Sequence, residues 1–301
     1  MINHAQSFML AFSAFIQIIG WNCAFAEKSL EKIHLFKNGR CCAAVLVDPQ
    51  ASAQVRDSAA LLARCFQLST GVHLSVSKRP ASSKPIRIHV GLSKYVTHHV
   101  KDLKELDGDG FVIAFPNNRN IVIAGPTDWG AEFGVYEFLE RYVGVRWLFP
   151  GPAGEHVTKN STLDIPVKEV RQEPAFFSRQ LSGLRGKEQK SWARRNRMHG
   201  RVRFHHNLLR LFPPEKYTKI YPKFFPIIRG RRYLPPTNRT HGWQPCFSAP
   251  GIVEEAIKNI CNYFSEHPKE TSYSLGVNDS SGYCECKECR ERDNGKKNFL
   301  G

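Results

Sequence analysis

Acidic residues are scarce in this sequence. It contains 27 Asp and Glu against 43 Lys and Arg, which gives a formal net charge of +16. The shortage is greatest from Lys168 to Arg239, where 19 Lys and Arg accompany 4 Glu and no Asp. A positive field that concentrated favours an anionic partner, such as an acidic polysaccharide, a nucleic acid or a charged surface.

Long apolar runs, internal repeats and low-complexity tracts are missing after the first 26 residues. Their absence argues against later membrane-spanning segments and against a repeat architecture. The chain of 301 residues is 42% hydrophobic and 11% aromatic. This is enough apolar material to fill packed cores in two domains of ordinary size.

Residues 1–26 have the pattern of an export signal. An apolar run from Phe8 to Ile19 precedes the small-residue cleavage site Ala24-Phe25-Ala26. The run is shorter than the ~20 residues needed to cross a bilayer, so export is favoured over a membrane anchor. We expect a secreted or periplasmic protein with no membrane attachment after cleavage. Removal of Cys23 would leave eight of the 9 cysteines, an even number that suits an oxidising compartment.

Residues 27–170 are predicted to form a compact α/β domain. Apolar runs and periodic patterns predict strands at 43–47, 73–76 and 86–90, a hairpin of 110–115 and 121–124, and helices at 53–68 and 127–142. A stretch rich in Gly and Pro from 151 to 174 then marks the domain boundary, which we place near Val170.

Residues 171–301 are predicted to form a second α/β domain. Strand patterns at 176–181, 202–208 and 273–277 alternate with helical patterns at 187–198 and 250–264. This alternation is typical of parallel βα units, which keep their chemistry at the carboxyl ends of the strands. A closed barrel needs eight units, so we expect the first part of an incomplete (β/α)8 barrel.

Polar residues follow two of these predicted strands. Asn278-Asp279 follows the strand at 273–277, where Asp279 is a candidate catalytic acid; the alternative is that it only caps the next turn. His205, His206 and Asn207 end the strand at 202–208 and could bind sugar hydroxyls, although one histidine could instead be buried against its neighbours.

A long aromatic and basic excursion from 212 to 247 is a second candidate for substrate binding. Arg231, Arg232, Tyr233 and Trp243 could stack on a sugar ring and bind a uronate carboxylate. The alternative is that the excursion packs over the mouth of the barrel. The arginines at 194, 195, 197 and 201 are expected on a solvated helix face.

Three cysteines form a C-x-C-x-x-C pattern at Cys284, Cys286 and Cys289. With Cys246 as the fourth thiolate they could hold a structural zinc, but disulfides explain the cysteines equally well in an exported protein. Carboxylate acid–base chemistry needs no cofactor.

Two stretches, 125–140 and 145–151, resemble the small α/β domain that precedes the barrel in α-glucuronidases and β-hexosaminidases. Four later stretches are similar to a bacterial family labelled a domain of unknown function and related to those hydrolases: Trp192–Arg197, His205–Asn207, Gln244–Phe247 and Gly276–Cys289. The resemblance implies a glycoside hydrolase-like fold, a carbohydrate substrate and catalysis by acidic side chains, with Asp279 as the acid and Asn278 as its polar neighbour. The related hexosaminidases have a second acidic residue in this pair, whereas Asn278 cannot donate a proton at neutral pH. We therefore expect the second carboxylate beyond Gly301.

The leading hypothesis is a glycoside hydrolase, or a fragment of one, that acts on a polysaccharide which could contain uronic acids. The alternative is a carbohydrate-binding protein without catalysis, because the acid pair is incomplete. Nucleic-acid binding ranks third, since an export signal and the lack of a recognition helix beside the cysteines argue against it.

Overall fold

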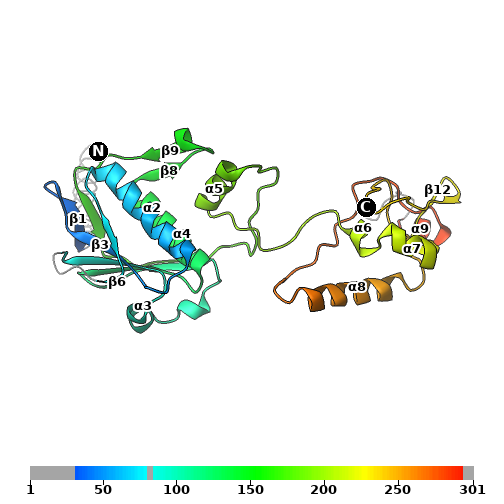
Figure 1. Ribbon diagram of the computed structural model, residues 1–301, viewed down its shortest axis with the longest axis horizontal. Coiled ribbons are helices and arrows are strands. Elements are labelled where there is room, and N and C mark those ends of the chain that lie inside the picture. The colour runs from blue at the N-terminus through cyan, green and yellow to red at the C-terminus, as the bar shows by residue number, and fades with distance from the viewer. Residues whose placement is uncertain (1–30, 80–83, 294–301) are drawn as a thin grey trace, which may run out of the picture. The chain divides into compact units, whose positions relative to one another are not determined.

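The computed structural model describes residues 31–79 and 84–293 (Figure 1). The predicted export signal lies outside the described residues. The chain divides into two compact units. The first runs up to Ala175 and includes Arg185–Arg197, and the second contains Phe176–Leu184 and the residues from Met198 onward. None of the described helices is both long and apolar enough to cross a membrane.

The first unit is built mainly of β-sheet covered by helices. Its strands are β1 (Lys32–Lys37), β2 (Arg40–Cys41), β3 (Ala43–Val47), β4 (Ser75–Ser77), β5 (Ile86–Val90), β6 (Phe111–Asn117), β7 (Asn120–Ala124), β8 (Val145–Trp147), β9 (Glu155–Val157), β10 (Leu163–Pro166) and β11 (Val170–Gln172). Its helices are α2 (Ala53–Thr70), α3 (Lys94–His99), α4 (Asp128–Phe138) and α5 (Lys187–Arg195), with short helical turns η1 (Leu103–Glu105), η2 (Leu139–Val143) and η3 (Pro152–Gly154).

The main sheet has six strands in the order β11-β6-β7-β5-β3-β4. Strands β4, β3, β5 and β7 are mutually parallel, and β6 forms an antiparallel hairpin with β7. Smaller sheets join β10, β1 and β2, and β8 with β9. The α/β prediction for this part of the chain is confirmed. Val170–Gln172 forms the edge strand β11 of the same sheet, and the first unit continues to Ala175.

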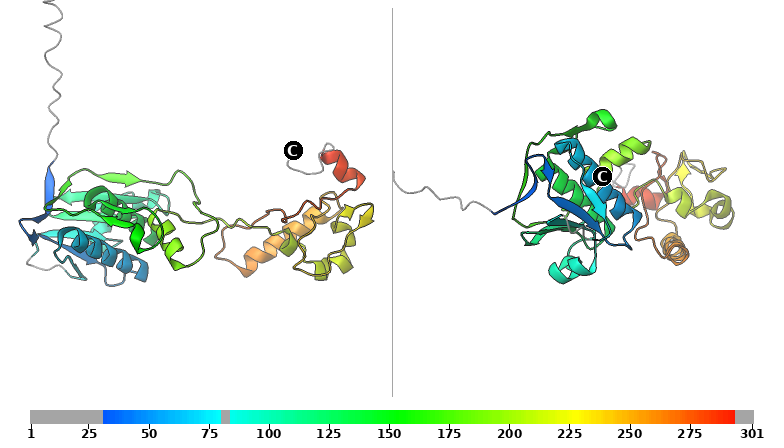
Figure 2. Two further views of the ribbon diagram at one scale, coloured as in Figure 1. Left: turned by 90° about the horizontal axis from the view of Figure 1, so that it is seen from above. Right: turned by 60° about the vertical axis from the view of Figure 1, so that its left-hand side comes forward.

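Alternating side chains of the sheet enter two apolar layers. Val45, Ile88 and Ile123 pack in the core beneath α2 and α4, which lie next to each other (Figure 2). On the opposite face, Val112 and Val122 pack with residues of α3 and η1. This arrangement follows from the period of two in a strand, which sends successive side chains to opposite faces.

Two glycines set the approach of α4 to the sheet. A Cβ on Gly130 would lie 2.1 Å from the Gly110 carbonyl oxygen, and a Cβ on Gly125 would lie 2.6 Å from the Gly130 Cα. The helix begins beside them, where the Thr127 hydroxyl accepts hydrogen bonds from the backbone N–H groups of residues 129 and 130. Only glycine allows the end of β7 and the start of α4 to approach this closely.

The second unit is mostly helices and loops around one apolar cluster. Its elements are α6 (Leu208–Leu211), α7 (Pro214–Ile220), η4 (Pro222–Phe224), β12 (Ile227–Ile228), β13 (Arg231–Arg232), α8 (Ile252–Glu266) and α9 (Lys287–Arg292). The predicted helix at 250–264 is confirmed as α8. The strands predicted at 176–181, 202–208 and 273–277 are not formed, and single β-bridges, Arg179 with His199 and His206 with Gly276, stand in their place.

Candidate functional site

Residues 205–207 and 274–278 lie side by side in the second unit. His206 and Gly276 form a parallel β-bridge, and the Asn207 N–H donates to the Gly276 carbonyl at 2.9 Å. The Ser274 hydroxyl donates to the His205 carbonyl at 2.6 Å. A Cβ on Gly276 would lie 2.6 Å from that carbonyl oxygen, so glycine is required for the approach. The two segments predicted to present polar side chains are therefore neighbours with the same direction.

Asn278 is a buried structural residue. Its side chain is bonded at both ends: Oδ1 accepts from the Leu209 N–H and Nδ2 donates to the Trp243 carbonyl, each at 2.9 Å. Its backbone N–H and carbonyl are both bonded to the Gln244 amide, at 3.0 and 2.6 Å. Asn278 is only 2% exposed. It joins the start of α6, the loop at Trp243 and Gln244 and its own turn, so its side chain has a structural role beside Asp279.

Asp279 follows Asn278 and is exposed. Its carboxylate makes no hydrogen bond or ion pair with any residue that the structure describes. The backbone before it is held by the bonds of Asn278, which sets where the Asp279 side chain leaves the turn. The Asp279 side chain does not cap this turn. The Ser280 N–H donates to the Asn278 carbonyl, and the Gly282 N–H donates to the Ser280 hydroxyl.

The histidines next to this turn differ in their surroundings. The His205 ring bonds to the Asn207 Oδ1 at 3.1 Å, and Asn207 is buried with its amide donating to the Ser274 carbonyl at 2.9 Å. His206 is exposed, and its Nδ1 lies 2.6 Å from the Val277 carbonyl. Because a carbonyl can only accept, Nδ1 carries the proton and Nε2 is left as the second polar atom of the ring.

A polar hollow of about 470 Å³ lies beside these segments. It is lined by His206, Leu209, Arg210, Pro213, Asn238, Arg239 and His241. The lining contains two guanidinium groups and two imidazoles and no carboxylate. It is therefore suited to a ligand that is anionic or rich in hydroxyl groups. Asp279 is not part of the lining, although the Asn278 side chain before it bonds to Leu209 in the wall.

The excursion at 212–247 contributes Pro213, Asn238, Arg239 and His241 to this hollow, but not the residues that were predicted to bind a sugar. Trp243 is 0% exposed, packs against Phe225 and donates its indole N–H to the Thr240 carbonyl at 2.7 Å. The expectation that Trp243 stacks on a sugar is wrong, because neither face of its ring is accessible. Arg231 and Arg232 are exposed on the β12–β13 hairpin, and Tyr233 packs against the apolar cluster. None of these residues lines the hollow, whereas the neighbouring Arg239 and His241 were missed.

Four cysteine sulfurs meet in the second unit. The Sγ atoms of Cys246, Cys284, Cys286 and Cys289 all lie within 4.8 Å of one another. The hydrogen bond to the Cys284 thiol lowers the pKa of Cys246, and the same contact raises the pKa of Cys284. The four side chains therefore share one site, in which the two thiols affect each other's ionisation. The expected grouping is present, while its occupant stays a proposal.

The arginines of α5 form ion pairs within the first unit. Arg194 pairs with Glu132, which is also bonded to Tyr136 and Gln54. Arg195 pairs with Glu155 at 3.2 Å. These contacts overturn the expectation of a solvated helix face. No local sequence pattern predicts these ion pairs, because the glutamates lie some 40–60 residues away from the arginines along the chain.

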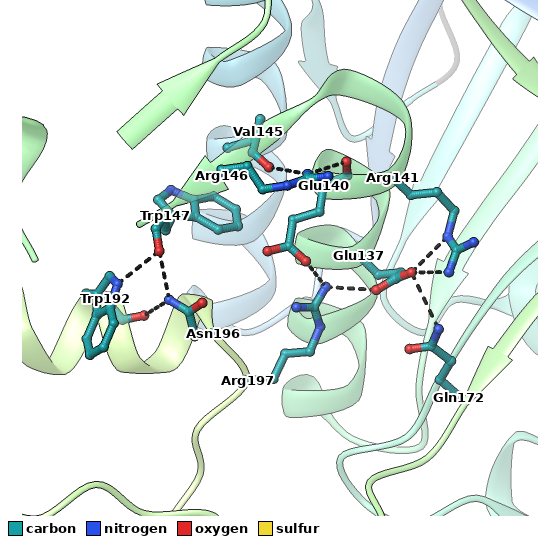
Figure 3. Close-up of polar contacts among 10 residues, drawn as sticks. All are labelled: Glu137, Glu140, Arg141, Val145, Arg146, Trp147, Gln172, Trp192, Asn196 and Arg197. Atoms are coloured by element: carbon teal, nitrogen blue, oxygen red, sulfur yellow. Dashed lines mark hydrogen bonds and ion pairs between the residues drawn. The ribbon is translucent and has the colours of Figure 1, made fainter. Parts of the chain in front are cut away.

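Further bonds hold the end of α5 and the residues after it (Figure 3). Arg197 lies between Glu137 and Glu140, with oxygen distances of 2.9 and 2.6 Å. The Trp192 indole N–H donates to the Trp147 carbonyl at 3.0 Å. The basic residues of this segment therefore neutralise acids of the first unit and are not all available to an external partner.

A larger hollow of about 860 Å³ lies between α2, α4 and α5 in the first unit. Two of its charged wall residues, Glu132 and Arg194, are paired with each other. Burial and the neighbouring Glu132 carboxylate raise the pKa of Tyr136, which therefore acts as a hydrogen-bond donor across the neutral pH range. The polar groups at this position have structural partners, so it is a weaker candidate site.

The family model described as Domain of unknown function (DUF4838) matches residues 149–299. The chain therefore belongs to this family, and the predicted membership of a domain-of-unknown-function family is confirmed. The match includes the four later stretches quoted from the sequence. A comparison with curated proteins gives no match.

Several solved glycoside hydrolases are similar to part of the chain. A β-hexosaminidase of Streptomyces plicatus is 15% identical over 49% of this chain and 24% of its own, with a TM-score of 0.33. A family GH115 4-O-methyl-α-glucuronidase is 20% identical over 49% of this chain and 19% of its own, with a TM-score of 0.36. The chitobiase of Flavobacterium johnsoniae is 15% identical over 50% and 20%, with a TM-score of 0.30. The chain thus spans a quarter or less of the length of these enzymes, and its α/β architecture is established by its own sheets and helices.

Proposed function

We propose that the chain is part of a glycoside hydrolase-like protein whose second unit binds an acidic saccharide. The observation that carries the proposal is the hollow lined by Arg210, Arg239, His206 and His241, at the place where residues 205–207 and 274–278 run parallel. Guanidinium groups bind a uronate carboxylate through paired hydrogen bonds, and imidazole and amide groups suit sugar hydroxyls.

Asp279 is the proposed proton donor to the glycosidic oxygen. Its exposed carboxyl follows a turn whose backbone is fixed by the bonds of Asn278. A fixed backbone at this position favours acid catalysis, because the proton must come within hydrogen-bond reach of the leaving oxygen. Cleavage also needs a second carboxylate as base or nucleophile.

Binding can be tested with the full chain and two matched polymers. Glucuronoxylan and unsubstituted xylan differ in the uronate side groups, and isothermal titration calorimetry measures the affinity for each. We expect measurable binding to glucuronoxylan and at least about tenfold weaker binding to plain xylan, because a charged hydrogen bond contributes roughly 1.5–3 kcal/mol. Equal affinity for both polymers would remove the anionic recognition.

Two arginine variants test whether the saccharide binds in the hollow. Arg239→Ala removes a cation from the hollow, and Arg231→Ala removes one from the β12–β13 hairpin outside it. We expect the first substitution to weaken glucuronoxylan binding about tenfold and the second to leave it unchanged. The reverse order would move the site to the hairpin.

A second candidate function is binding without cleavage. It is favoured by the lining of the hollow, which has no carboxylate, and by the structural role of Asn278. Incubation of the full-length protein, with whatever sequence follows Gly301, and measurement of new reducing ends from the same polymers separates the two. Release of reducing ends that is lost in Asp279→Asn supports hydrolysis, whereas binding without new reducing ends supports recognition alone.

A further inference from the structure

The four-cysteine cluster has the dimensions of a metal site. Cys246 Sγ lies 3.8 Å from Cys286 Sγ and 3.9 Å from Cys289 Sγ. A tetrahedral zinc ion with Zn–S bonds of about 2.3 Å holds its sulfurs about 3.8 Å apart. The observed separations agree with that spacing, and the remaining pairs lie within 4.8 Å.

A pair of disulfides explains this geometry less well. Cys246 is almost equally distant from two sulfurs, and the Cys284 sulfur also lies within 4.8 Å of it. A disulfide joins one sulfur to a single partner at about 2.05 Å and leaves the other two cysteines to pair separately. A single compact group of four sulfurs is the arrangement that a shared ion produces.

Hydrogen-bond donors surround the sulfurs in the way that metal-bound thiolates require. The Ile227 N–H donates to Cys284 Sγ at 3.3 Å, and the Cys289 N–H donates to Cys286 Sγ at 3.4 Å. The Ser248 hydroxyl lies 3.2 Å from Cys286 Sγ and 3.1 Å from Cys289 Sγ. Such outer contacts orient the ligands and stabilise their negative charge.

We propose that Cys246, Cys284, Cys286 and Cys289 bind one zinc ion with a structural role. Four thiolates form a closed tetrahedral set that favours zinc and leaves no position for a substrate or a water molecule. The ion would connect the loop after Trp243 with the segment 284–289, some 40 residues further along the chain. Cys246, Cys284 and Cys289 are themselves part of the buried cluster of the second unit.

We infer a structural role for the ion because the second unit contains little regular secondary structure. Its β-ladder is one short hairpin of two residues per strand, and its buried cluster is built largely from loops and short helices. An ion that joins four ligands releases a large binding free energy only when those ligands are brought together, so metal binding and folding of this unit are coupled.

The first test measures the metal in the full chain. The protein is purified under reducing conditions, dialysed against buffer with zinc and then against metal-free buffer, and analysed by mass spectrometry for metal content. We expect about one zinc per chain, and a thiolate-to-cobalt charge-transfer band when cobalt replaces zinc. Protein that retains no zinc and gives no such band with cobalt would overturn the proposal. Peptide mapping that finds these cysteines joined in disulfides in protein purified without reductant would also overturn it.

The second test uses matched cysteine variants. Cys286→Ser removes one ligand, whereas Cys261→Ser changes an exposed cysteine of α8 outside the cluster. Competition with a chromogenic chelator should show zinc affinity at least about tenfold weaker in the first variant and unchanged in the second. Equal affinity in both would contradict the assignment. If Cys286→Ser does not fold, the cobalt spectrum of the unmodified chain still tests whether the four thiolates bind a metal ion.

Discussion

Arg194 of α5 forms an ion pair with Glu132 of α4, a carboxylate that is only 3% exposed as a residue. Glu132 also accepts hydrogen bonds from the Tyr136 hydroxyl and the Gln54 amide. A carboxylate this buried needs a cation, because leaving it unpaired costs several kcal/mol. The pair therefore attaches α5 to the rest of the first unit.

Removing the cation should destabilise the first unit. We expect Arg194→Ala to lower the free energy of unfolding by about 2 kcal/mol or more, since it leaves the Glu132 charge buried and unpaired. Adding Glu132→Gln to that variant should restore part of the loss, because the uncompensated charge is gone. Urea unfolding measures all three proteins. Arg171→Ala is the control, since its contact with Glu169 at 3.4 Å is exposed and should contribute less than about 0.5 kcal/mol.

Glu155 should make stability depend on acid pH. Burial opposes its ionisation, but hydrogen bonds from Arg64 and Trp147 outweigh burial and lower its pKa below the usual value. The charged form is therefore favoured in the folded state, and its contribution is fully present above the unfolded pKa of about 4.3 and is lost as pH falls through the folded pKa. We expect Glu155→Gln to be less stable than the parent at pH 7, with a difference that shrinks below about pH 4. A difference that stays constant across this range would show that the carboxylate charge is not responsible.

The glycine at the start of α4 should not tolerate a side chain. A Cβ on Gly130 would lie 2.1 Å from a backbone oxygen, which has no flexible way to move aside. We expect Gly130→Ala to lower the free energy of unfolding by about 3 kcal/mol. Gly242→Ala is the matched control, because nothing lies within 4 Å of its added Cβ. The melting temperatures of both variants are measured by thermal unfolding. Similar values would argue against a close contact between residue 130 and the Gly110 carbonyl.

Replacing Asn278 by Asp should destabilise the protein, whereas replacing Asp279 by Asn should not. Asn278→Asp removes the donor to the Trp243 carbonyl and buries a charge, so we expect a loss of about 2–4 kcal/mol in stability of the second unit. Asp279→Asn changes an exposed side chain and should leave stability within about 0.5 kcal/mol. Chemical unfolding followed by circular dichroism compares both variants with the parent protein. Equal stability of the two variants would contradict the buried role of Asn278.

The sequence was most informative where local patterns are strong. The strand at Ala43–Val47 and the helix at Ala53–Thr70 agree with the predicted ranges to within two residues. Both have an apolar period that matches one type of element, and Ser52 and Gly71 cap the helix as their chemistry predicts. The β6–β7 hairpin was predicted for the same reason, from two apolar runs around a polar turn.

The second unit was less predictable because side chains replace backbone pairing. The strand expected at 202–208 would need a neighbour for its N–H groups, but the Arg203 and His205 N–H groups donate to the hydroxyls of Ser272 and Ser274. Serine hydroxyls compete with a β-ladder for these donors, and an apolar pattern does not reveal the competition. The parallel direction of the two segments was nevertheless retained in the bridge of His206 and Gly276.

The sequence predicted some residues of the candidate site and missed others. The grouping of Cys246 with the C-x-C-x-x-C segment was predicted from the residue type, and the neighbouring positions of His206 and Gly276 from the expected ends of two strands. Arg239 and His241 were missed because no local period marks a loop residue that lines a hollow. The buried position of Trp243 also depends on packing by Phe225, which lies 18 positions earlier in the sequence.

The path of the chain sets how the protein can be divided. It leaves the first unit after Ala175, returns for Arg185–Arg197 and then departs again. A fragment that stops at Ala175 would retain Glu132 and Glu155 but lose the α5 arginines that neutralise them. Expression of the amino-terminal part alone should therefore extend through Arg197, because a shorter fragment leaves the buried Glu132 carboxylate without its arginine.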